Sequence, residues 1–168
     1  VSSIPARHTL SVLVDNEPGV LARIAGLFSG RGYNIESLTV SETEHEKHVS
    51  RITIVTTGTA MVIEQIKHQL DRLVPVHRVV DLTTEGEAIE RELALVKLVG
   101  KGESRSEALR LAAAFGARTV DATLDSFVFE LTGTSEEIER YLRAVSELGL
   151  AEVSRTGIAA MARGVAAF

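Results

Sequence analysis

The sequence repeats one order of strand and helix patterns, and this repeat constrains the fold more than any other feature. Alternating apolar residues over 8–14 are typical of a half-buried strand, and apolar residues at helical spacing over 20–28, ended by Gly30 and Gly32, predict a helix. Runs rich in β-branched residues predict two paired strands after it. In order, the first half predicts a strand, a helix, two strands, a helix and a strand at 8–14, 20–28, 33–42, 49–57, 62–73 and 76–82.

The second half repeats this order after a charged stretch at 83–92. Ser104 with Glu107, and Thr134 with Glu137, have the spacing of a capping box, which marks the start of a helix. The predicted elements are a strand, a helix, two strands, a helix and a strand at 93–99, 104–115, 117–124, 126–133, 134–145 and 150–154.

Two βαββαβ units predict an α+β protein with two ferredoxin-like domains, each an antiparallel sheet with helices on one face. We place the domains at 1–84 and 85–168. The other face or the edges of each sheet must also be covered, so the sequence predicts docking between domains or a homo-oligomer. The apolar tail at 158–168 is either a docking segment or a frayed end.

Composition excludes several classes of protein. The 168 residues carry a formal net charge of −5, with both signs mixed along the chain, which disfavours binding to the phosphate backbone of a nucleic acid. Cysteine is absent, which removes disulfides and thiol chemistry and fits a reducing compartment. No apolar run approaches the roughly 18–20 residues of a membrane span, and the first residues lack a signal-peptide pattern. We therefore expect a cytoplasmic protein without a nucleic-acid or membrane partner.

No catalytic motif stands out. The chain has no nucleophile elbow, no distinctive carboxylate pair and no Walker motif, and the segments GRGYN and GKGES lack the third glycine of a dinucleotide fingerprint. His45 and His48, beside Glu42, Glu44 and Glu46, could ligate a metal, but a charged hairpin tip is more often only solvated. We interpret the chain as non-catalytic, with no metal site and no cofactor of its own.

The segment DNEPG at 15–19 joins the first strand to the first helix and offers binding chemistry. With Pro18 at the first helical position, the amides of Gly19, Val20 and Leu21 have no helical acceptors and point outward at the positive end of the helix dipole. The carboxylate of a free amino acid fits such a site.

An amino acid also needs acceptors for its ammonium group and an apolar socket for its side chain. Asn16 and Asn34 offer side-chain carbonyls, while Ile35, Val20 and Leu21 offer the socket. Spacing alone favours a plainer alternative, in which Asn16 satisfies the turn, Asn34 adopts a left-handed conformation and the apolar residues belong to the core.

The segment HTLSVLVDNEPGVLARIAGLFSGRGYNIESLTV resembles the start of the regulatory, or small, subunit of acetolactate synthase, also called acetohydroxyacid synthase. The similarity continues in collinear order through SRITIV, EQIKHQLDRLVPVHRVVDL, ERELALVKL and SRTGIAAMARG, and so covers nearly the whole chain. The segment GRGYNIESL is much more specific than the turn itself.

This resemblance implies an N-terminal ACT domain, a ferredoxin-like module that senses amino acids, followed by the C-terminal ferredoxin-like domain of the family. Family members have no activity of their own. They bind the catalytic, or large, subunit, raise its activity and confer feedback inhibition by valine in branched-chain amino acid biosynthesis. Thiamine diphosphate, FAD and Mg2+ belong to that catalytic partner, and this chain shows no motif for them.

In the family, valine lies between the ACT domains of two subunits, which implies a homodimer here. The residues carried over to this sequence are Asn16 and the amides of Gly19, Val20 and Leu21 from one turn, with Asn34 and Ile35 from the opposing subunit. Asp15, Glu17 and Pro18 are given turn-shaping roles only.

Two other interpretations stay open. A stand-alone amino-acid-binding ACT regulator of another enzyme explains the first half equally well, but it leaves the half from ERELALVKL to SRTGIAAMARG unexplained. A small enzyme is the third. Whether leucine or isoleucine also binds, and which residues contact the catalytic subunit, does not follow from the sequence.

Overall fold

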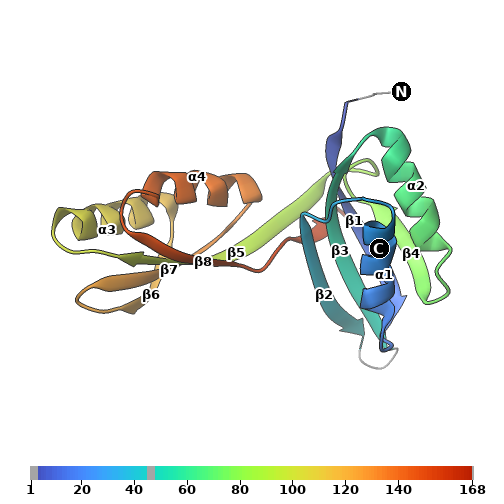
Figure 1. Cartoon of the computed structure of the whole chain (residues 1–168), viewed down its shortest axis with the longest axis horizontal. Helices are drawn as coiled ribbons and strands as arrows, with labels where there is room; N and C mark the ends of the chain where they lie inside the picture. Colours follow the sequence, from blue (N-terminus) through green and yellow to red (C-terminus); the bar gives the residue numbers. More distant parts are fainter. Residues whose placement is uncertain (1–3, 45–47, 168) are drawn as a thin grey trace. The chain divides into compact units, whose positions relative to one another are not determined.

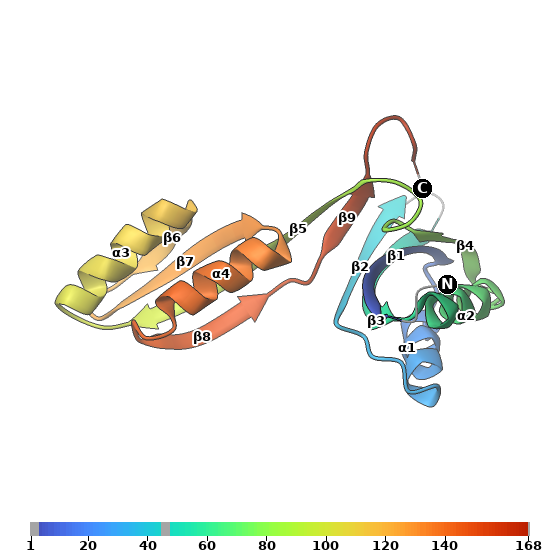
Figure 2. The same ribbon diagram turned by 90° about the horizontal axis from the view of Figure 1, so that it is seen from above.

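The computed structural model describes residues 4–44 and 48–167 as two compact units (Figures 1 and 2). The first unit combines the chain up to Ile89 with the segment from Ile158 onward, and the second is Glu90–Gly157. The sequence predicts a boundary at 84/85, with the tail in the second domain. In the structure the tail belongs to the first unit, because its packing partners lie on the first sheet.

The first unit has the ferredoxin-like order of elements. Its antiparallel sheet has the strand order β2-β3-β1-β4, so the first and last strands of the unit are neighbours. Leu10 of β1 pairs with Ile54 of β3 and with Asp81 of β4. The elements are β1 (Ala6–Asp15), α1 (Val20–Gly30), β2 (Ser37–Glu44), β3 (Val49–Gly58), α2 (Ala60–Asp71) and β4 (Val76–Asp81).

One face of this sheet packs against both helices. Alternate residues of β1 point to that face, and the helices contribute residues at helical spacing, as the apolar pattern of the sequence predicts. The fully buried core residues are Leu10, Val12, Val14, Val20, Ile24, Phe28, Ile52, Ile54, Ile63, Ile66 and Leu70.

The other face of the first sheet is also buried. Its residues include Ser11, Thr53 and Val55, which are at most 4% exposed. The tail lies against this face: Thr39 Oγ1 of β2 donates to the carbonyl of Ile158 at 2.7 Å, and the amide of Ile158 donates to Ser37 Oγ at 3.0 Å. Ile158 is itself only 3% exposed. Of the two possibilities for the tail, the structure therefore shows the docking segment.

The second unit repeats the order. Its sheet runs β6-β7-β5-β8, all antiparallel. The tail forms β9 (Ala159–Ala162), which pairs with β5 but is assigned to the first unit. The helices pack on one face around Phe129, Ile138 and Tyr141, which have no exposed surface. The elements are β5 (Ala88–Val99), α3 (Glu103–Phe115), β6 (Arg118–Ala122), β7 (Ser126–Gly133), α4 (Ser135–Val145) and β8 (Leu150–Arg155). The predicted α+β class with two βαββαβ units is confirmed.

The two predicted capping boxes differ in outcome. At α4 the box is present, since the amide of Glu137 donates to Thr134 Oγ1 and the amide of Thr134 donates to Glu137 Oε2 at 2.7 Å. At α3 the prediction is wrong. The helix begins at Glu103 after Gly102, whose φ of 62° directs the chain into the helix earlier, and the Ser104 hydroxyl donates to the carbonyl of Leu148 instead. Across the described residues, no helix is long and apolar enough to cross a membrane.

Candidate functional site

The β1–α1 turn is held by two backbone hydrogen bonds to other parts of the first unit. The amide of Asp15 donates to the carbonyl of Pro75 at 2.8 Å, and the amide of Asn16 donates to the carbonyl of His48 at 2.7 Å. The position of the turn is therefore set by the residues that precede β3 and β4 as well as by its own sequence.

Helix α1 begins at Val20, as the apolar spacing predicts, but two residues after Pro18, the predicted first helical position. Its N-cap is Gly19, with φ of 86°, and Val20 is the first helical residue. Pro18 therefore lies in the preceding turn and not at the first helical position. A left-handed N-cap is open to glycine because a side chain there would be strained. The positive φ alone is thus enough to explain why residue 19 is a glycine.

The amides at this helix start differ in availability. The amide of Val20 donates to the carbonyl of Glu17 through a long bond of 3.4 Å, whereas the amides of Gly19 and Leu21 have no acceptor within the described part of the chain. The first turn of α1 carries no acidic side chain, so its positive dipole end is not neutralised there. The amides of Gly19 and Leu21 are therefore free and that of Val20 is only weakly bonded, an arrangement that suits an anion.

The side chains around the turn divide between core and surface. Val20 is 5% exposed and belongs to the core, so its side chain does not form the predicted socket. Leu21 is 43% exposed, and Asn16 is exposed as well. The turn therefore offers one apolar side chain, one amide side chain and backbone donors.

Asn34 and Ile35 precede β2. Asn34 does not have a positive φ, so the left-handed conformation of the plainer interpretation is wrong. Its carbonyl accepts a hydrogen bond of 2.6 Å from Thr56 Oγ1, while its side chain is exposed. Ile35 packs partly against the core of the first unit. The backbone of this pair is fixed, and the Asn34 amide group faces solvent.

A single chain does not bring the two halves of the candidate site together. Asn16 and Leu21 lie at the start of α1, whereas Asn34 and Ile35 follow its end. An eleven-residue helix is about 16 Å long at 1.5 Å per residue, which is too far for one amino acid to span. A ligand that contacts both halves needs a second copy of the chain.

The residues that hold these backbones were not predicted. Thr56 fixes Asn34, and the carbonyls of His48 and Pro75 fix the turn. Thr56 has no exposed surface. Its sequence signal is its position as a polar residue at the end of an apolar run, where a buried hydroxyl needs a hydrogen-bond partner. The two carbonyls carry no such signal, because backbone groups are present at every residue.

The acidic loop at 42–48, a candidate metal site in the sequence, lies partly outside the described residues. His45 and Glu46 lie outside the described residues, while His48 is exposed with φ of 50° and uses its carbonyl to hold the turn. Within residues 4–44 and 48–167, no group of three or more His, Cys, Asp or Glu side chains is arranged to hold a metal ion.

Comparison with known families divides the chain close to the boundary between Ile89 and Glu90, although the second match continues past Gly157 into the tail. Residues 10–78 match the family model described as an AHAS small subunit-like ACT domain. Residues 91–164 match the model described as the small subunit of acetolactate synthase. The two matches are collinear and cover both sheets.

Individual relatives agree with the family models. The acetolactate synthase small subunit of Haemophilus influenzae is 45% identical over 159 residues, which cover 94% of this chain and 96% of the relative. That of Mycolicibacterium smegmatis is 41% identical over 157 residues, or 94% of this chain and 91% of the relative. The crystal structure of the Thermotoga maritima small subunit superimposes with a TM-score of 0.84 at 36% identity, covering 96% of this chain and 99% of the other.

Proposed function

Because this chain belongs to the acetolactate synthase small-subunit family, we propose that it binds the catalytic subunit, raises its activity and confers feedback inhibition by valine. The family and its name support the regulatory role and the existence of a catalytic partner. The observation that carries the valine part is the helix start, where the amides of Gly19 and Leu21 have no acceptor among the described residues.

Each group of valine has a counterpart in the proposed site. The carboxylate accepts from the amides of Gly19 and Leu21, with the longer-bonded amide of Val20 as a third donor. The ammonium group donates to the side-chain carbonyls of Asn16 and of Asn34 in a second copy. The isopropyl group lies against Leu21 and Ile35. The length of α1 supports the two-copy arrangement, because one chain separates these groups.

Regulation follows from ligand binding across two copies. A ligand held by both chains favours the dimer arrangement in which the two halves of the site face each other, and a bound catalytic subunit responds to that arrangement. Couplings of this kind are typically about 1–3 kcal/mol, enough for partial or strong inhibition. In this proposal the chain binds no cofactor, and thiamine diphosphate, FAD and Mg2+ are held by the catalytic subunit in the cytoplasm.

Asn34→Ala tests the site. We expect it to weaken valine inhibition of the reconstituted enzyme at least tenfold while leaving activation of the catalytic subunit largely intact, since a ligand hydrogen bond is lost but the Asn34 carbonyl keeps its bond to Thr56. Ser29→Ala, an exposed change on α1 outside the site, is the control. Titration calorimetry of each isolated variant with valine, leucine and isoleucine gives affinity, selectivity and stoichiometry. Full valine sensitivity of Asn34→Ala would show that the site is misplaced.

A stand-alone amino-acid-binding ACT regulator is the second candidate, supported by the ACT match over 10–78 alone. The match of residues 91–164 to the small-subunit model weighs against it. Co-purification with the catalytic subunit separates the two, since a stand-alone regulator would not retain that subunit. Turnover of substrate by the isolated chain would instead support an enzyme.

A further inference from the structure

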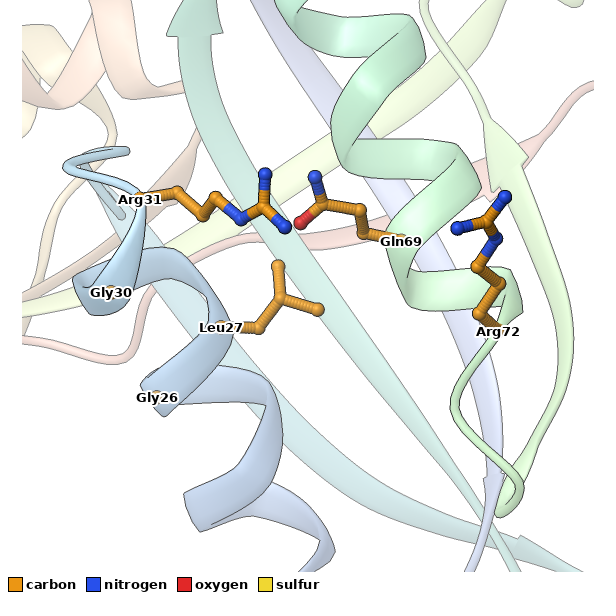
Figure 3. Close-up of a pocket in the computed structure, with 6 residues that line it drawn as sticks. All are labelled: Gly26, Leu27, Gly30, Arg31, Gln69 and Arg72. Carbon is orange, nitrogen blue, oxygen red and sulfur yellow. The ribbon is translucent and has the colours of Figure 1, made fainter.

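A groove between α1 and α2 in the first unit shares no residue with the proposed valine site. It has a volume of about 380 Å3 and is lined by Gly26, Leu27, Gly30, Arg31, Gln69 and Arg72. Figure 3 shows Arg31 and Gln69 reaching toward each other from the two helices, with Leu27 extending into the space below them and Arg72, just past the end of α2, pointing away from this pair.

The groove is cationic. Neither Arg31 nor Arg72 has an acidic partner within the described residues, although acidic residues outnumber basic ones over the whole chain, at 23 to 18. The sequence of α1, VLARIAGLFSG, contains no Asp or Glu at all. A guanidinium group presents donors in a fork that matches a carboxylate, so two unpaired guanidinium groups beside one groove favour an acidic occupant.

Gly26 is not explained by packing within the first unit. It lies in the middle of α1, its φ is not positive, and a Cβ added there would meet no atom within 4 Å. Glycine is less favourable than alanine inside a helix, so this position carries a cost that no contact in the described chain requires. The absence of a side chain at Gly26 leaves space on that side of the groove.

We propose that this groove docks a carboxylate-bearing segment of the catalytic subunit. The identity of that partner rests on the proposed function, whereas the chemistry of the occupant follows from the groove. A carboxylate pairs with Arg31, the Gln69 amide bonds to a backbone group, and an apolar side chain contacts Leu27, while Arg72 adds positive charge at the end of the groove. The open wall at Gly26 admits the backbone of the segment.

Charge reversal tests the electrostatic part of the proposal. We expect Arg31→Glu and Arg72→Glu, each made in the full chain, to weaken binding to the catalytic subunit at least tenfold, with a smaller salt dependence than the wild type. Arg23→Glu is the matched control, because Arg23 is an exposed arginine on α1 that does not line the groove. Binding is measured by surface plasmon resonance at two salt concentrations.

Two outcomes keep this proposal separate from the proposed function. Wild-type binding by both groove variants overturns the groove while leaving the small-subunit role intact. Failure of the wild-type chain to bind the catalytic subunit overturns that role. Valine titration of the isolated groove variants is expected to match the wild type, since the groove and the helix start share no residue.

Gly26→Ala tests the shape of the groove without changing its charge. The added methyl meets no atom of the described chain, so helix propensity is expected to raise the Tm of the isolated chain by a few degrees. The same methyl fills the groove wall, and we expect affinity for the catalytic subunit to fall severalfold. A purely structural glycine would not combine a higher Tm with weaker binding, and unchanged affinity would contradict the docking of a backbone segment there.

Discussion

The hydroxyl of Tyr141 is a polar group in an apolar environment. The residue has no exposed surface, and its ring lies 5.3 Å from that of Phe115. No hydrogen-bond partner for its hydroxyl is found in the described parts of the chain. Burial raises the pKa of Tyr141 to about 12, because the ionised phenolate loses hydration. The second unit therefore retains a polar atom that its packing does not use.

Tyr141→Phe is expected to keep or raise the free energy of unfolding at pH 7, by up to about 1 kcal/mol, since it removes a buried group without a partner. The pKa of about 12 in the folded state lies above the usual value of 10. The contribution of Tyr141 to the free energy of unfolding is therefore fully present below pH 10 and is lost as the pH rises toward 12. The Phe variant lacks this loss. Urea unfolding of both proteins from pH 7 to 11 measures the difference, and a Phe variant more than 1 kcal/mol less stable at pH 7 would reveal a partner for the hydroxyl.

At the candidate site, the environment of each named side chain could be predicted from the sequence only in part. The resemblance marked Asn16, Leu21 and Asn34, whose side chains are exposed in the structure. It did not show that the side chain of Val20 is buried, and the helix begins at Val20, two residues after the predicted start at Pro18. The turn itself is held by the carbonyls of His48 and Pro75, which are distant from it in sequence and are not encoded locally.

Helix starts allow a paired prediction at the scale of elements. Thr134→Ala removes the N-cap hydroxyl of α4 and is expected to lower the free energy of unfolding by about 1 kcal/mol. Ser104→Ala removes no cap, because α3 begins at Glu103, and should cost less, through one long bond of 3.4 Å to Leu148. Thermal and urea unfolding of the two variants compare these costs, and an equal or larger loss for Ser104→Ala would contradict the helix start seen in the structure.

Elements with a local signal were predicted closely, and those set by distant contacts were not. The strand at 126–133 agrees with β7 at both ends, because alternating aromatic and apolar residues define it and glycine and threonine end it. The tail had no such signal. Its place depends on the hydroxyls of Ser37 and Thr39, which bond to Ile158 from more than a hundred residues away in sequence. Long-range pairing of this kind is not visible in periodicity.

The whole molecule is organised as one unit inserted into another. The first unit is interrupted after Ile89 and resumes at Ile158. Its second sheet face is covered by a segment that follows the complete second unit in sequence. The stability of the first unit therefore depends on the residues from Ile158 onward.

Deletion of the chain from Ile158 onward tests this dependence. Losing the burial of Ile158 and its two hydrogen bonds is expected to cost the first unit about 3–5 kcal/mol. Hydrogen exchange should accelerate in β1 and β3, while α4 and β7, which belong to the second unit, keep wild-type protection. Ile158→Ala is the milder control. Unchanged exchange in β1 and β3 would mean that the tail does not support the first sheet.

The insertion also fixes the order in which a ribosome can complete the two units. All residues of Glu90–Gly157 are translated before Ile158, so the second unit can fold as soon as it leaves the exit tunnel. The first unit is translated earlier, but its Ser37 and Thr39 hydroxyls cannot form their hydrogen bonds to Ile158 until the second unit has been made. The part of the protein made first is thus the part finished last, and a nascent chain exposes the second face of the first sheet throughout that interval.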